Sequence, residues 1–177
     1  MKCGNYTLAA IAKQCKDNAG GIKAIYIADA DAISAVTMDA TAETINSIVM
    51  SGSATFAKWE FAAQTGTFTS TATISEENGT LYFQNDVALV FGQMEKVKRL
   101  QIMAATVSNT IVIVKDSNNR LFYLGYDNPV SASAAGGEAG TAMGDRNGYT
   151  ITLTDYSKGL PMEVDMAAAD LAAIGID

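Results

Sequence analysis

The sequence predicts a mainly β protein, either a β-sandwich or a small barrel, with a minor α-helical part and one flanking helix. Three observations carry this prediction. Runs of β-branched and aromatic residues alternate with residues that favour turns. Gly, Ala, Ser and Thr are abundant and Pro occurs only twice in 177 residues, which suits strands and closely packed neighbours. Only one long stretch has helical spacing, at residues 93–105.

The chain is predicted to form one domain over residues 1–177, because its length allows a substantial core and no linker divides it. Its expected parts share that one core but differ in structure. They are an N-terminal lid helix and turn at 1–21, a long hairpin at 67–91, a helix at 93–105, a core sheet at 106–156 and a C-terminal extension at 157–177.

The N-terminal residues predict a small helix followed by a strand. Asn5 or Thr7 is a suitable N-cap, and the glycines at 20 and 21 are expected to end the helix. A strand is then predicted at residues 22–28, followed by an acidic turn. The apolar face of the helix is expected to comprise Leu8, Ile11 and Cys15.

The following stretch has no firm period and is predicted to be irregular up to residue 48, with a possible strand at 33–38. A further strand is predicted at residues 54–62 from its alternating bulky side chains. Phe56 is one residue out of phase with Trp59 and Phe61, so a β-bulge is expected between them.

A long hairpin has the strongest local signal. Two β-prone runs, at residues 67–75 and 80–91, flank the sequence Glu76-Glu77-Asn78-Gly79, and Asn-Gly between such runs is typical of a hairpin turn. The strands are rich in Thr and expose two polar faces. The hairpin is therefore expected to project from the body or to pack on another subunit.

The helix at residues 93–105 is expected to cover an open sheet face. The side chains that share one face by helical spacing are Met94, Val97, Leu100, Gln101 and Ala104. The densest basic spot of the chain lies elsewhere around this helix. It comprises Lys96, Lys98 and Arg99, for which a solvated face is the first interpretation and contact with acidic neighbouring subunits the alternative.

Residues 106–156 predict a core sheet. Two strands, at 110–114 and 120–126, are joined by a turn at 116–119, and a third strand at 147–156 alternates Tyr, Ile and Leu with Thr. The small residues at 130–144 between them predict a long loop without structure of its own, ordered by a partner. Beyond the sheet, an Ala-rich helix of one or two turns and a peripheral C-terminus are expected.

Composition excludes several functions. The formal charge of −7 disfavours a nucleic-acid reader, because affinity for phosphates comes mainly from Lys and Arg. The chain has no His, which removes the commonest general base and the commonest zinc ligand. Cys3 and Cys15 alone cannot close a zinc site, and buried thiols are expected, with a disulfide or redox role as the alternative. No enzyme activity, catalytic residue, metal or cofactor is therefore predicted.

Other candidate motifs also have structural explanations. The glycines at 136, 137, 140 and 144 lack the Lys and the following helix that a phosphate loop needs. Acidic groups around Asp31 and Asp116 lack the glycine of a calcium loop and are expected to form turns. No secretory signal and no membrane-spanning run is expected, so synthesis in a reducing cytoplasm is predicted.

Three segments carry a resemblance to a known family. They are Cys3 and Cys15 with the run at residues 20–29, the sequence Leu-Gly-Tyr-Asp-Asn at 124–128, and residues 140–149. The chain resembles virion structural proteins of tailed bacteriophages of the crAss-like, Bacteroides-infecting type, and among these tail-tube-like or tail ring proteins. None of the matching motifs is catalytic.

The resemblance implies a sandwich or small barrel flanked by a helix, assembled as a homo-oligomeric ring of six or twelve copies in the virion tail or neck. Such a ring would be built in the bacterial host cytoplasm and would continue the DNA channel as a passive wall. It would contact other tail, neck or portal proteins and would not bind a membrane. A capsid decoration or fibre-like binding protein is the alternative. The expected inter-subunit contacts are Glu76, Glu77, Asn78, Gly79, Gly136, Gly137, Glu138, Gly140 and Met143.

Overall fold

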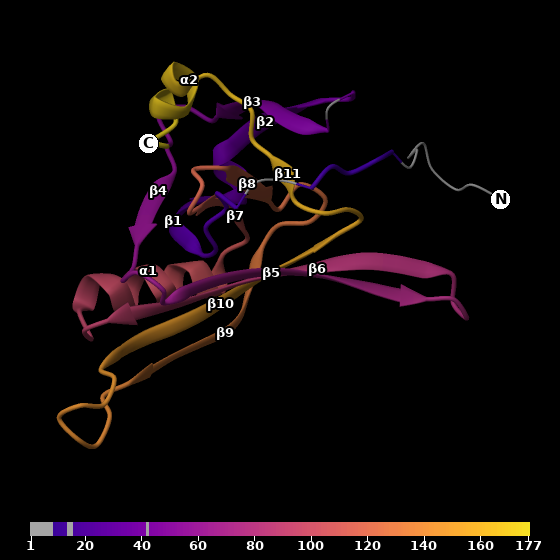
Figure 1. The fold of residues 1–177 in the computed structure, drawn as a ribbon. Helices are drawn as coiled ribbons and strands as arrows, with labels where there is room; N and C mark the ends of the chain where they lie inside the picture. Colours follow the sequence, from indigo (N-terminus) through magenta and orange to yellow (C-terminus); the bar gives the residue numbers. More distant parts are fainter. Residues whose placement is uncertain (1–8, 14–15, 42) are drawn as a thin grey trace.

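The computed structural model describes residues 9–13, 16–41 and 43–177, and these residues form a mainly β structure with one principal helix (Figure 1). The described elements are β1 (Ile22–Asp29), η1 (Ala30–Ala32), β2 (Ile33–Asp39), β3 (Thr44–Met50), β4 (Ala57–Glu60), β5 (Gly66–Ser75), β6 (Thr80–Gly92), α1 (Lys96–Val107), β7 (Thr110–Asp116), β8 (Leu121–Leu124), β9 (Ser131–Glu138), β10 (Gly148–Ser157), β11 (Met162–Glu163) and α2 (Ala168–Ala173).

The strands form two open sheets and a separate hairpin. The first sheet has the order β11-β8-β7-β1-β4, the second has the order β5-β6-β10-β9, and β2 pairs with β3. The two larger sheets face each other across a shared hydrophobic core, with α1 beside the second sheet (Figure 1). The predicted β-sandwich flanked by one helix is confirmed, and since both sheets have free edges a closed barrel is not formed.

The first sheet is buried on both faces. One face of β1 and β7 contributes Ile25, Ile27, Val112 and Val114 to the core shared with the second sheet. The opposite face packs Tyr26 and other side chains against the β2–β3 hairpin and the C-terminal segment. Burial on both faces explains why these two strands have nearly unbroken apolar runs rather than an alternating pattern.

Along the strands of the second sheet, side chains point alternately into the core and outward, as expected for a sheet with one buried face. Val87, Leu89 and Phe91 of β6 and Ile151 and Leu153 of β10 point into the shared core. The side chains between them point outward, among them three threonines of β10. The predicted alternation of the third strand is therefore confirmed.

The predicted core sheet at residues 106–156 is wrong as a single unit. β7 and β8 pair with each other in the first sheet, as expected for the predicted hairpin, whereas β10 pairs with β6 and β9 in the second sheet. The alternation of β10 predicts a half-buried strand but carries no information about which strand is its neighbour.

The predicted loop at residues 130–144 is also wrong over most of its length. Residues 131–138 form β9, which pairs with β10 from Ser131 opposite Thr154 to Glu138 opposite Gly148. The ladder along β10 stabilises a strand that small residues alone would not predict. Only residues 139–147 form the loop between β9 and β10.

The bulge expected between Phe56 and Trp59 is absent. β4 pairs with β1 in continuous register from Ala57 opposite Ile27 to Glu60 opposite Ala24. Phe56 packs on the core beneath the β2–β3 hairpin, whereas Trp59 and Phe61 pack on the core shared with the second sheet. The change of phase reflects the two apolar sides of one sheet, not an extra residue.

The predictions for the N-terminal helix and for the region after β1 have different outcomes. The expected N-terminal helix falls partly on residues outside the described ones, as do Cys3 and Cys15, while residues 9–13 and 16–20 are not helical. The region expected to be irregular contains β2, the possible strand, and also β3.

The short C-terminal helix is present as α2, but the expectation of a peripheral C-terminus is wrong. Ile174 and Ile176 are buried against Tyr26 and Ile113 in the second core. Their burial ties the end of the described chain to the centre of the first sheet.

Candidate functional site

The β5–β6 hairpin extends beyond the rest of the second sheet. β10 ends opposite Phe83, so from that point to the turn the two strands pair only with each other (Figure 1). The turn contains the predicted Glu76, Glu77, Asn78 and Gly79, all exposed, and Gly79 adopts the positive φ that a turn of this kind requires. The predicted projecting hairpin is confirmed.

The hairpin end carries exposed apolar side chains beside its two carboxylates. Ile74 and Leu81 lie opposite each other across the strands and are 70% and 54% exposed. Among the described residues, Glu76 and Glu77 form no ion pair. We call residues 74–81 the hairpin tip. An acidic and apolar tip held away from the body has the composition of a contact surface.

Helix α1 exposes the face that was expected to be buried. Ile102 and Ala105 pack into the core, whereas Met94, Val97 and Leu100 are exposed, so the predicted apolar face is wrong. The helix carries apolar residues all round its C-terminal half, so its own periodicity cannot decide which side faces the sheet. Lys98, whose Nζ lies 2.6 Å from the carbonyl oxygen of Gly92, lies on the inner side of the helix.

The outward face of α1 is apolar along its length. Lys96, Leu100, Met103 and Val107 follow one another at i, i+4, i+7 and i+11, which places them on one stripe of a helix. Leu100 is 47% exposed, Met103 56% and Val107 84%. We call these four residues the α1 stripe. A surface helix without a partner normally has polar residues there.

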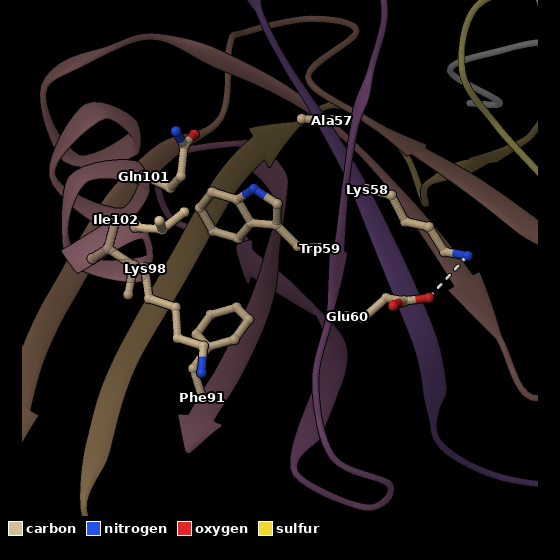
Figure 2. Close-up of a pocket in the computed structure, with 9 residues that line it drawn as sticks. Ala57, Lys58, Trp59, Glu60, Phe91, Lys98, Gln101 and Ile102 are labelled. Atoms are coloured by element: carbon tan, nitrogen blue, oxygen red, sulfur yellow. Dashed lines mark ion pairs between the residues drawn. The ribbon is translucent and has the colours of Figure 1, made fainter. Parts of the chain in front are cut away.

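A groove lies between α1 and β4, on the flank of the helix that carries Val97 and Gln101 (Figure 2). Its cavity volume is about 380 Å³, and the indole of Trp59 lies edge-on to the ring of Phe91 with centroids 5.7 Å apart. Lys58 and Glu60 lie on the far side of β4, joined by an ion pair of 3.0 Å. The groove is lined mainly by apolar atoms of Trp59, Phe91, Val97 and Ile102.

The other predicted contact residues lie at the end of the second sheet away from the hairpin tip (Figure 1). Gly136 and Gly137 are in β9, opposite Thr150 and Tyr149, and a Cβ on Gly137 would lie 2.7 Å from the Tyr149 ring. Gly137 therefore serves strand pairing within the chain, whatever else it contacts.

The loop beyond β9 is closed by its own hydrogen bonds. The backbone N–H groups of Thr141 and Ala142 each donate to Asp145 at 2.7 Å, and they hold the pKa of that carboxyl below its usual range. The Arg146 guanidinium pairs with Glu138, and Gly140 has a positive φ. Met143, at the loop's outer side, is fully exposed.

One buried polar pair lies near the base of the hairpin. Asn85 of β6 and Asp155 of β10 face each other in register, and the Asn85 amide donates to Asp155 at 3.0 Å and to Ser157 at 2.9 Å. The Oδ1 atoms of Asn85 and Asp155 are buried and have no hydrogen-bond partner among the residues that the structure describes. Burial raises the pKa of the Asp155 carboxyl, against the opposing effect of the Asn85 and Gly125 N–H groups.

A second polar cluster holds the C-terminal residue. The Tyr26 hydroxyl donates to the Asp177 side chain at 2.5 Å, and the Lys58 ammonium lies 2.9 Å from the same carboxylate. These two hydrogen bonds lower the pKa of Asp177 to about 2. Burial and the bond to Asp177 raise the pKa of Tyr26 to about 12.

The Asp177 cluster predicts an acid-dependent loss of stability. Because its folded-state pKa lies below the ordinary value of 3.8, the carboxylate stabilises the fold above about pH 4, and this contribution is lost as the pH falls towards 2. Urea unfolding between pH 5 and pH 2 should show Asp177→Asn less stable than the parent at pH 5, with the gap closing towards pH 2. Glu77→Gln, in the exposed turn, is the control and should show no gap. A constant gap for Asp177→Asn would contradict the assignment.

The acidic turn at Asp116 is structural, as expected. Its Oδ1 accepts from the backbone N–H groups of Asn118 and Arg120 at 2.8 and 2.7 Å, which shapes the β7–β8 turn. Within the described parts of the chain, no three acidic or thiol groups are placed to hold a metal ion. None of the described helices is both long and apolar enough to cross a membrane.

Comparison with known proteins adds no assignment. No family model, no curated protein and no solved structure matches this chain.

Proposed function

We propose that the chain is a structural virion protein of a tailed phage that assembles with copies of itself into a ring in the tail or neck, where the ring continues the DNA channel. The observation that carries this proposal is the second sheet, which is open at both edges and whose outer-face side chains are exposed or half-buried except for Thr154. The hairpin tip and the α1 stripe supply further unpartnered surface.

The two edges of this sheet differ and can join copies head to tail. β5 spans ten residues at one edge and β9 eight at the other, and each has hydrogen-bonding backbone groups on its free side. Pairing β5 of one copy with β9 of the next repeats a single heterologous contact, which closes into a ring when the rotation per copy divides a full turn. Six or twelve copies are the sizes proposed here.

The outer face of the sheet suits the wall of a channel for a polyanion. Its side chains are mostly Thr, from β5 and β10, with Ala and Val from β6. Asp86 is the one charged residue among those on this face over 67–73, 82–90, 131–136 and 150–156. Its carboxylate accepts hydrogen bonds from Thr154 at 2.6 Å and from Gln84 at 2.9 Å. A face without Lys or Arg offers phosphates no counter-charge to bind.

Proline at the β9 edge tests the ring. Successive N–H groups of an edge strand point alternately towards β10 and away from it, so Ala134→Pro and Ala135→Pro are matched variants. One removes a bond within the sheet and lowers stability, while the other removes only an outward N–H. We expect light scattering to show six or twelve copies for the parent. The proline variant that loses only an outward N–H should be a folded monomer.

The same measurement can reject the proposal. A parent protein that stays a monomer or a trimer, and adheres to capsids or glycans, would contradict the ring and favour the decoration or fibre-like alternative. Rings that survive both proline substitutions, with circular dichroism unchanged, would show that β9 is not the edge that joins copies.

A further inference from the structure

The hairpin tip and the α1 stripe are complementary surfaces on one molecule. The tip presents Glu76 and Glu77 next to the exposed Ile74 and Leu81. The stripe presents Lys96 next to exposed Leu100, Met103 and Val107, with Arg99 on the adjacent flank of the helix. Each surface combines apolar side chains with charges of one sign, and the two signs are opposite.

Within the described part of the chain, the carboxylates of the hairpin tip form no ion pair, and neither do Lys96 and Arg99 of the helix. Lys98, in contrast, is held by Glu95 at 3.3 Å and by the Gly92 carbonyl. The helix is a basic element on a chain with a formal charge of −7. An acidic partner is therefore favoured for it, and the acidic hairpin tip of a second copy meets this requirement.

The positions of the two surfaces exclude contact within one copy. The hairpin tip and α1 lie at opposite ends of the second sheet, and the tip points away from the helix (Figure 1). A contact between them joins one copy to another along the strand direction. This direction is perpendicular to the edge-to-edge pairing proposed for the ring.

We propose that the hairpin tip of one copy docks on the α1 stripe of a second copy in the next layer. Glu76 and Glu77 pair with Lys96 and Arg99, and Ile74 and Leu81 pack on Leu100 and Met103. This inference rests on the proposed ring and adds the contact that stacks rings into a tube.

A photo-crosslinking experiment with the full chain tests the docking. Asn78 in the turn is replaced by p-benzoylphenylalanine, and copies labelled with ¹⁴N and ¹⁵N are mixed, irradiated, digested and analysed by mass spectrometry. The expected product links residue 78 of one copy to residues 96–107 of another. Glu76→Lys with Glu77→Lys should reduce this product about tenfold, and so should Lys96→Glu with Arg99→Glu.

Exchanging the charges of the hairpin tip and of the helix is the decisive experiment. Mixing the copy reversed at the tip with the copy reversed on the helix should restore the product, because each mixed contact again joins opposite charges. Asp29→Lys with Asp31→Lys, two exposed carboxylates in another turn, is the matched control and should leave the yield unchanged.

The outcomes separate this proposal from the ring itself. Rings that persist by light scattering while residue 78 links elsewhere, or to no other copy, overturn the docking and leave the ring in place. A link from residue 78 to a different protein added from virions, with none to α1, also overturns it. A parent protein that remains monomeric at all concentrations, with no link, overturns both.

Discussion

Replacing Leu153 with Ala is expected to lower the free energy of unfolding by about 3 kcal/mol. Leu153 lies in β10 with no exposed surface, opposite Val87 of β6, and it belongs to the core shared by the two sheets. The substitution removes buried apolar surface and leaves a cavity between sheets that cannot close without moving strands. The chain has one tryptophan, Trp59, whose fluorescence can follow unfolding in urea.

A matched control is Leu160→Ala, because Leu160 is exposed in the segment between β10 and β11. Its effect should stay within about 0.5 kcal/mol. Equal effects of the two substitutions would show that the sandwich core is not built around Leu153. The comparison therefore tests the facing of the two sheets directly.

Adding one methyl group at Gly148 is expected to destabilise the fold by about 3 kcal/mol, the upper end for overpacking in a core. Gly148 is buried at the start of β10, opposite Gly92 of β6 and Glu138 of β9. A Cβ there would lie 2.0 Å from the carbonyl oxygen of Phe91. Since the obstacle is backbone, no side-chain rotation can relieve the clash, and β6 and β10 must separate.

Gly159→Ala is the control, because a Cβ at Gly159 would meet no atom within 4 Å. Its midpoint in urea should match the parent, while that of Gly148→Ala falls clearly. If Gly148→Ala unfolds with the parent's midpoint, the pairing of β6 with β10 at this end of the sheet is wrong.

Local signals predicted the elements whose own residues determine them. The hairpin at β5 and β6 follows from Asn78-Gly79 between Thr-rich runs, and the β7–β8 turn follows from Asp116 and its neighbours. In both cases the turn sequence and the flanking strands act over a few residues. The fold class followed from several such elements together.

The errors concern choices that depend on distant parts of the chain. The residues of β9 have low strand propensity and become a strand because β10 offers them a ladder. Likewise the orientation of α1 is set by the packing of Ile102 and Ala105, not by its own periodicity. The exposed apolar stripe was therefore not predicted, although the hairpin tip and the basic residues of α1 were.

The partners of β1 have a consequence for the order in which the chain folds. β1 begins at Ile22, but its neighbours in the first sheet are β4 and β7, and Tyr26 in its centre packs against Ile176. Synthesis from the N-terminus therefore leaves this central strand without its second neighbour until β7 has emerged, and without the packing of Ile176 until that residue has followed. Long-range pairings of this kind fold slowly. This late completion of the first sheet delays the moment at which a folded subunit can meet another copy, which favours assembly from folded subunits over pairing between nascent chains.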